Sequence, residues 1–359
     1  MTDTPSRQHP EQPRTLAAAG RQQNPSRKDA LKFLTALAFG LTLWLASWLV
    51  LIAGQLGKAH PDNVWVEEAY ALKLTAAERL RGREKVLLVG GSATMFGVDS
   101  AQLAEHLGKP VVNLGINAGL GTYAVPELVD HVLEHGDLVV MPLEYRLLLW
   151  DGVPSYVTLS WGLAHPETLL HWSPKTLLWG LWSLPLERVL QGYKSFDRAA
   201  VKRGPYGVHN LNPWGDQTNT ASTLRTDAQR QALINQPPER YDALYGESTL
   251  GLDVWQQWWK RWQARGVCLV VVPPPFLYVA DYASPSFTAF FDGVPDRVMA
   301  RGVPYLGHPS DGFFSVEAMF DTNYHLTAES RVAFTDRLAM SLRSGDLNCL
   351  AQYSRQDTH

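Results

Sequence analysis

One stretch constrains this chain more than any other, because residues 33–57 contain no charged side chain. They read FLTALAFGLTLWLASWLVLIAGQLG. About 20 apolar residues suffice for a helix to cross the hydrocarbon core of a bilayer, so the run predicts a transmembrane signal anchor. A cleaved signal peptide fits less well, because the polar leader is long and no clear A-x-A site follows. A buried core helix would not usually be apolar all round.

The charges that flank this run predict its orientation. Basic residues gather in the leader, residues 1–32, whereas Lys58 is followed by Asp62, Glu67 and Glu68. The positive-inside rule therefore places the leader in the cytoplasm and the body outside it. The leader is rich in Pro, Gln, Arg and Ser and is expected to be disordered. In a Gram-negative cell this would be a single-pass inner-membrane protein with a periplasmic body.

The first part of the body alternates short apolar runs with helical patterns. Continuous apolar runs at 85–90, 110–116 and 137–145 are typical of strands buried on both faces. Helical patterns at 100–108 and 122–136 lie between them. This alternation predicts an α/β domain with a mostly parallel sheet and helices on both of its faces.

The pattern breaks at about residues 150–250, where Trp, Pro, Asn and Gly are frequent and helical pieces occur near 166–196. We interpret this region as a Trp-rich insertion, suited to a lid, a polysaccharide groove or docking onto a membrane partner. The domain resumes with a helix, a strand at 267–275 and a last helix at 327–345. The predicted organisation is a leader at 1–32, an anchor at 33–57, a connecting helix at 58–83, a domain at 84–345 and a tail at 346–359.

Small and polar residues follow the predicted strands, with Ser92, Gly115, Asn117 and Glu144 just past strand ends. Ligands of open parallel sheets bind at this edge. Ser92 follows two glycines in VLLVGGSATMFG. It is interpreted either as a helix N-cap or as a nucleophile, and Glu144 either as a site carboxylate or as a partner of Arg146.

A serine nucleophile needs a base, and the base needs an orienting group. In MFDTNYHLTAES, Asp321 precedes His325 by four residues, directly before the last helix. A short loop can place both side chains on one side. The alternatives are an ordinary loop role for His325, or a rival pair made of His308 and Asp311.

These residues resemble the SGNH/GDSL hydrolase superfamily, whose blocks are matched in order by GGSATMFG, NLGINAG and FDTNYHLTAES. With the anchor ahead of it, the chain is similar to the membrane-anchored envelope branch that includes alginate O-acetylation proteins and teichoic-acid D-alanyl-transfer proteins. The resemblance implies a flavodoxin-like three-layer α/β/α fold. It covers residues 84–150 and 252–345.

The chain departs from the family pattern in three places. Gly91 stands where the family has Asp, and the last block is D-x-x-x-H instead of D-x-x-H. The G-x-N-D block is replaced by PLEYRLL, which contains Glu144 and Tyr145. That block supplies an oxyanion-hole asparagine in the family, and Asn117 is the candidate substitute here.

The resemblance implies acyl transfer through an ester on Ser92, with His325 as base and then acid and Asp321 as its orienting group. The oxyanion would be held by the N–H groups of Ser92 and Gly115, with the Asn117 amide, and Glu144 and Tyr145 would contribute to substrate binding. The implied function is O-acylation, in the first place O-acetylation, of an envelope polysaccharide or exopolysaccharide, with a membrane-bound O-acyltransferase partner. Two alternatives are an esterase of the same fold and a non-catalytic module of a polysaccharide export system.

The remaining features exclude some functions. A formal net charge of -3 gives no reason to expect nucleic-acid binding. The chain has neither a P-loop nor a plausible zinc cluster, so no cofactor is expected, and its two cysteines, Cys268 and Cys349, do not make a disulfide framework. Four tryptophans lie on one face of a predicted helix, at positions Trp255, Trp258, Trp259 and Trp262. Such a face usually packs in the core, but it would also suit sugar stacking or a membrane interface.

Overall fold

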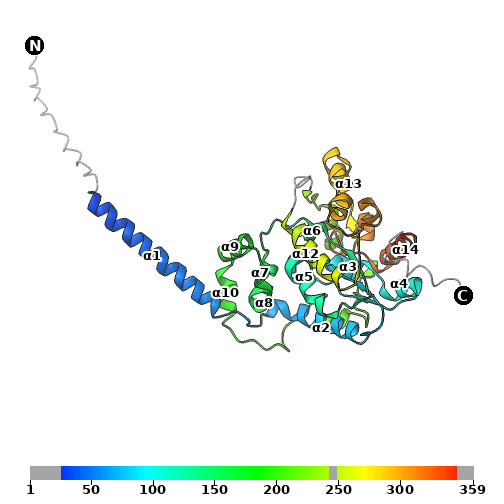
Figure 1. The fold of residues 1–359 in the computed structure, drawn as a ribbon, viewed down its shortest axis with the longest axis horizontal. Helices are drawn as coiled ribbons and strands as arrows, with labels where there is room; N and C mark the ends of the chain where they lie inside the picture. The colour runs from blue at the N-terminus through cyan, green and yellow to red at the C-terminus, as the bar shows by residue number, and fades with distance from the viewer. Residues whose placement is uncertain (1–25, 242–248, 346–359) are drawn as a thin grey trace, which may run out of the picture. The chain divides into compact units, whose positions relative to one another are not determined.

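The computed structural model describes residues 26–241 and 249–345. The chain forms two compact units that divide between Ala53 and Gly54. The first contains helix α1, Arg27–Ala53 (Figure 1), which is long and apolar enough to span a membrane. Because α1 begins at Arg27, the last residues of the expected disordered leader are helical, with Ser26 Oγ accepting from the Asp29 N–H. The rest of that leader and the predicted tail, residues 346–359, lie outside the described residues.

The second unit is built on a sheet of four parallel strands in the order β2-β1-β3-β4. Val86 pairs with Val111 and with Leu138, and Leu138 pairs in turn with Cys268. This confirms the predicted mixed α/β class and the parallel sheet. The strands are β1 (Val86–Leu88), β2 (Val111–Asn113), β3 (Leu138–Pro142) and β4 (Cys268–Val272).

Every residue of these strands is buried, as expected where helices contact both faces of a parallel sheet. One face packs Leu88 and Val140 into a core with Leu103 of α4 (Ser100–Leu107) and Leu338 of α14 (Ala328–Ser344). From α12 (Leu250–Ala264), Trp259 Nε1 contacts Met141 Sδ of β3 at 3.3 Å. The flavodoxin-like three-layer form of this arrangement stays a prediction.

The tryptophan stripe of α12 belongs to the core. Trp255, Trp259 and Trp262 are fully buried, and Trp258 is 7% exposed. The stripe therefore packs inside the body instead of presenting a sugar-stacking surface.

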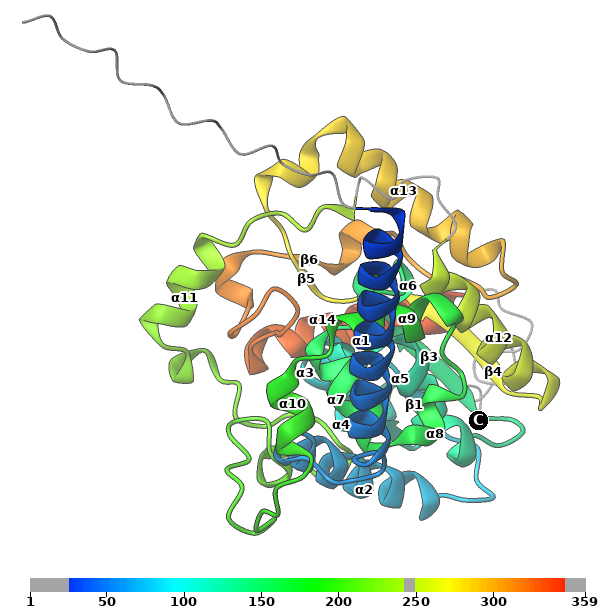
Figure 2. The ribbon, with the colours of Figure 1, turned by 90° about the vertical axis from the view of Figure 1, so that its left-hand side faces the viewer.

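Two features had not been predicted. Helix α13 (Pro285–Met299) contains Pro295, a residue that argues against a helix interior. A second, two-stranded sheet pairs β5 (Phe276–Leu277) with β6 (Phe313–Phe314). Figure 2 shows α13 beside this small sheet, on the opposite side of the body from α2 (Val64–Glu78).

The predicted insertion region belongs to the second compact unit, and its status as an insertion stays a prediction. Its helices are α7 (Tyr156–Ala164), α8 (Pro166–Leu169), α9 (Pro174–Ser183), α10 (Leu186–Gln191) and α11 (Asp227–Ile234). The other α-helices in the described part of the body are α3 (Ser92–Gly97), α5 (Gly121–Val129) and α6 (Tyr145–Leu148).

A buried polar network fastens the loop around residue 215 to the end of β2. Lys73 Nζ donates to the carbonyl oxygens of Asn113 and Gly215. Asp216 accepts from Asn113 Nδ2 at 2.9 Å and from Ser100 Oγ at 2.6 Å. Burial lowers the pKa of Lys73 to about 7, against the opposing effect of Asp216.

The buried amine predicts a pH-dependent stability. Between the folded pKa of about 7 and an unfolded pKa of about 10.4, the unfolded chain binds the extra proton. The free energy of unfolding should therefore rise with pH across this window, by on the order of 1 kcal/mol per pH unit. In Lys73→Met this contribution should vanish, as measured by urea unfolding of the full chain in detergent from pH 7 to 10. Equal slopes in both proteins would contradict the prediction.

Candidate active site

Ser92 is the first residue of α3, at the turn that follows β1. Gly91 occupies the N-cap position, and within the described residues Ser92 Oγ makes no hydrogen bond. The interpretation of Ser92 as a helix N-cap is therefore wrong. Its side chain is half-buried at the carboxyl edge of the sheet, where the described residues offer its hydroxyl no hydrogen-bond partner.

The turn around Ser92 is held by one buried carboxylate. Glu144 Oε2 accepts from the Gly91 N–H at 2.9 Å, and Glu144 Oε1 accepts from the Ala93 N–H at 2.8 Å. Burial raises the pKa of Glu144, although these backbone bonds act in the opposite direction. No ion pair with Arg146 is found in the part of the chain that the structure describes. Glu144 is therefore a positioning residue of the serine turn.

The segment after β2 packs directly against this turn. A side chain at Gly115 would lie 2.5 Å from Thr94 Cβ and 2.8 Å from the Gly91 carbonyl oxygen, so only glycine fits. A side chain at Gly91 would lie 2.6 Å from Ala118 Cβ. This close contact brings Asn117, the neighbour of Ala118, to the edge of the serine turn.

The backbone donors near Ser92 are only partly available. The Gly115 N–H, expected in the oxyanion hole, donates to Asn113 Oδ1 at 3.0 Å. Asn117 Oδ1 accepts from the Gly119 N–H at 2.8 Å, and its amide NH2 has no partner among the described residues. The Ser92 N–H likewise has no acceptor there, although both neighbouring N–H groups donate to Glu144.

The structure brings Asp321 and His325 together. His325 Nδ1 and Asp321 Oδ1 are 2.7 Å apart, and both side chains are 7% exposed. A bridge between Met319 and Leu326 closes the loop that carries them, directly before α14. The D-x-x-x-H spacing is thus accommodated by a tight loop, and Nε2 is the ring nitrogen left for a reacting proton.

Tyr206, which had not been predicted, adds a second hydrogen bond to Asp321. Its hydroxyl donates to Asp321 Oδ2 at 2.5 Å. Burial raises the pKa of Asp321, but the bonds from His325 and Tyr206 outweigh it and hold the pKa below its usual range. Tyr206 lies in a Gly- and Pro-rich loop that has no motif around it, so no sequence signal marked it.

Phe96 connects the histidine to the serine helix. Its ring stacks on the His325 ring, with centroids 3.8 Å apart and an interplanar angle of 8°. Ser92 and Phe96 are four residues apart on α3, which places them on one face with Cβ atoms about 5–6 Å apart. The stacking therefore places His325 against the short helix that carries Ser92, although no hydrogen bond joins the two among the described residues.

A cavity of about 380 Å³ lies near this cluster, although neither Ser92 nor His325 lines it. Asn117 lines it, together with Trp65, whose ring centroid is 6.0 Å from that of Tyr206. The lining also includes Asp62 and Tyr156. The cavity combines aromatic rings with a few polar groups, which is typical of a small-molecule or sugar site.

Tyr145, a predicted substrate-binding residue, lies elsewhere. It is fully buried, and its ring centroid is 5.4 Å from Phe291 and 5.5 Å from Phe276. Burial raises its pKa. The structure thus gives Tyr145 a packing role in an aromatic cluster.

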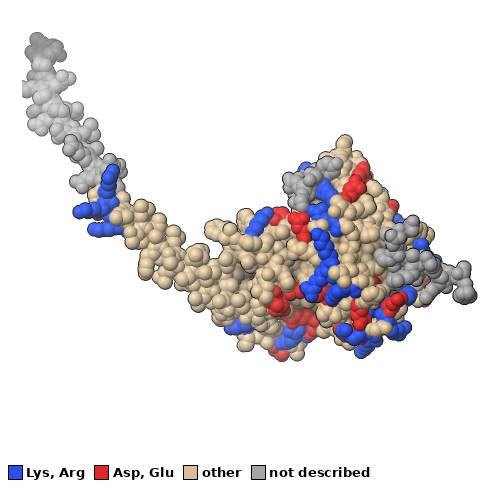
Figure 3. Space-filling view, in the orientation of Figure 1, with Lys and Arg blue, Asp and Glu red and all other residues tan. Residues whose placement is uncertain are grey.

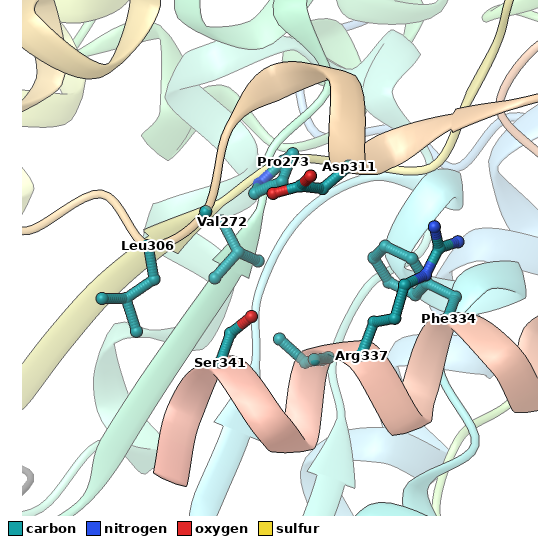
Figure 4. Close-up of a pocket in the computed structure, with 9 residues that line it drawn as sticks. Val272, Pro273, Leu306, Asp311, Phe334, Arg337 and Ser341 are labelled. Atoms are coloured by element: carbon teal, nitrogen blue, oxygen red, sulfur yellow. The ribbon is translucent and has the colours of Figure 1, made fainter. Parts of the chain in front are cut away.

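The rival pair of His308 and Asp311 forms a surface cap. Asp311 accepts from the His308 N–H at 2.7 Å, while the half-exposed His308 ring contacts Asp292 Oδ1 at 3.0 Å. Asp311 also borders a cavity of about 30 Å³ between β4 and α14, with Arg337 and Ser341 on the opposite wall (Figure 4). That volume holds about one or two water molecules, and neither Ser92 nor His325 lines it.

Comparison of the chain with protein-family models and with curated proteins finds no match. The resemblance to SGNH/GDSL hydrolases therefore stays a prediction, and function has to be inferred from the geometry of the site.

Glu144 holds the serine turn through two hydrogen bonds, and this predicts the effect of Glu144→Gln. A glutamine oxygen can replace one acceptor only, and its NH2 would face a backbone N–H. We expect a loss of about 1–3 kcal/mol in the free energy of unfolding, measured by urea titration. The control is Arg146→Gln, at an exposed position, which should stay within about 0.5 kcal/mol of wild type. Equal losses in both variants would show that Glu144 acts through Arg146.

Proposed function

We propose that this protein is a membrane-anchored, extracytoplasmic O-acyltransferase that modifies an envelope polysaccharide or exopolysaccharide through an acyl-Ser92 intermediate. The observation that carries the proposal is the Asp321–His325 pair, stacked on Phe96 one helical turn from Ser92. An acid, a base and a hydroxyl in this order suit acyl transfer. Acetyl is the proposed acyl group.

The reaction has two half-reactions. Ser92 Oγ attacks the acyl carbonyl of the donor while His325 Nε2 takes the serine proton, and the donor's leaving group departs with that proton. In the second step a sugar hydroxyl gives its proton to His325 and attacks the acyl-serine, and Ser92 Oγ regains a proton as the ester bond breaks. Asp321 holds the imidazole by its Nδ1–H throughout.

The oxyanion site proposed here differs from the simple sequence expectation. The Ser92 N–H and the Asn117 amide are the donors without other partners among the described residues near the turn. The Gly115 N–H would have to leave Asn113 Oδ1 before it could contribute. Asn117 would then take the part of the asparagine that the missing G-x-N-D block supplies in SGNH hydrolases.

The fold and the compartment are consistent with this proposal. The strand order β2-β1-β3-β4, with helices contacting both faces, supports a flavodoxin-like SGNH arrangement. Cys268 is disulfide-bonded, which supports an oxidising compartment such as the periplasm. Basic residues ahead of α1 support a cytoplasmic N-terminus. A membrane-bound O-acyltransferase is the proposed source of the acyl group.

The cavity beside the site is the proposed place of the acceptor. Trp65 and Tyr156 offer ring faces, and Asp62 and Asn117 offer hydrogen-bonding groups, for a sugar hydroxyl and its neighbours. Hydrolysis would use the same triad with water as the acceptor. A non-catalytic module is the second candidate, favoured by the occupied Gly115 N–H and by the absence of a Ser92–His325 hydrogen bond among the described residues.

The test uses the full chain in detergent with p-nitrophenyl acetate, following chromophore release and intact mass together. We expect an acetyl adduct on the wild type and none on Ser92→Ala, with release reduced about a thousandfold or more. Ser222→Ala, at an exposed serine, is the control and should behave as wild type. His325→Ala should also lose the adduct. Neither release nor adduct in the wild type would favour the non-catalytic module.

Asn117 gives a second prediction within the same assay. If its amide holds the oxyanion, Asn117→Ala should lower kcat/KM about a hundredfold. Asn117→Asp keeps an acceptor for the Gly119 N–H but removes the donor, so it should lose at least as much. A loss in the alanine variant alone would assign Asn117 to the turn and remove it from the oxyanion site.

A further inference from the structure

Helices α9 and α10 expose a cluster of large apolar side chains. Trp182 is 80% exposed and Leu178 is 69% exposed, which is unusual for side chains of this size. We define the α9–α10 patch by its exposed members Leu177, Leu178, Trp179, Trp182, Leu186 and Leu190. Figure 3 shows a largely uncharged surface over these two helices. A contiguous patch of this kind marks an interaction surface or a membrane contact.

Helix α10 buries a cation and exposes two leucines. Its cation, Arg188, is 1% exposed, with Nε donating to Ser160 Oγ and Nη1 donating to Gln55 Oε1, each at 2.9 Å. Leu186 and Leu190 of the same helix are 55% and 47% exposed. Arg188 thus points inward, while the two leucines are exposed beside Glu187, a mixture of apolar and charged groups that suits a boundary between water and an apolar phase.

The chain places this patch close to the end of the membrane-spanning candidate. Gln55, the partner of Arg188, follows Ala53, the last residue of α1, by two residues. Two residues span at most about 7 Å. Lys58 Nζ also lies 4.5 Å from the Tyr193 ring, directly after α10. If α1 crosses the bilayer, α10 is tied to the point where the chain leaves it.

We propose that the α9–α10 patch inserts into the interfacial layer of the bilayer that α1 spans. Leucine and tryptophan are the side chains that this layer favours. The proposal rests on the membrane anchoring in the proposed function, and not on the chemistry of Ser92. The patch would give the body a second attachment to the membrane, in the leaflet that faces the body. Ser160 both bonds Arg188 and lines the cavity beside the candidate site, so the cavity is held near the lipid surface.

The experiment measures lipid contact at two matched leucines. Leu186→Cys in α10 and Leu224→Cys in the 3-10 helix Ser222–Leu224 start from 55% and 57% exposure. Each full-length variant carries an environment-sensitive fluorophore and is reconstituted into phosphatidylethanolamine/phosphatidylglycerol vesicles. Flotation establishes that the chain is vesicle-bound, and wild type treated with the same fluorophore gives the background of the native cysteines.

We expect a blue-shifted emission at position 186 that spin-labelled lipids quench at least twofold more strongly than emission at position 224. Trp182→Cys serves as a second probe if the first variant does not fold, and it should behave as position 186 does. Equal quenching at 186, 182 and 224 in vesicle-bound protein would overturn the proposal and leave the patch as a surface for a protein partner.

The acetyl-adduct assay on the same vesicles keeps the two proposals apart. Lipid contact without an adduct would overturn the acyltransferase and leave the membrane contact in place. An adduct without lipid contact at 186 and 182 would overturn the membrane contact alone.

Discussion

The candidate site depends on one buried carboxylate that accepts hydrogen bonds from two backbone N–H groups. Glu144 comes from the end of β3, and the N–H groups of Gly91 and Ala93 come from the end of β1. Both donors are buried, so each would lose its hydrogen bonds without Glu144. The absent side chain at Gly91 and the presence of Glu144 are therefore two parts of one arrangement, in which the end of the neighbouring strand β3 supplies the acid that holds the serine turn.

A second group of buried polar side chains holds the loop of residues 206–216 next to the candidate site. Lys73 and Asp216 fix the segment that ends near Gly215 to the carboxyl end of β2. The same loop carries Tyr206 to Asp321. The orientation of the acid that holds His325 is thus set by residues more than a hundred positions away in the sequence, through contacts that lie wholly inside the protein.

The sequence predicted those features that depend on local pattern. The four parallel strands follow from continuous apolar runs, and the Asp321–His325 contact follows from a spacing that one short loop can close. Tyr206 and the bonds of Glu144 could not be predicted, because each depends on which distant segments meet. The same holds for the Gly115 N–H, whose acceptor Asn113 is near in sequence but is oriented by Asp216. Helix α13 was missed because Pro295 weighs against a helix.

The stacking of Phe96 on His325 has a mechanical consequence. Ser92 and Phe96 belong to one short helix, so thermal displacement of that helix carries the hydroxyl and the stacked imidazole together. When the imidazole gains a proton, the aromatic face beneath it also offers the positive charge an attraction of about 0.5–2 kcal/mol. In the proposed acyl transfer, Phe96 would thereby both position the His325 ring relative to the helix of Ser92 and stabilise its positive charge.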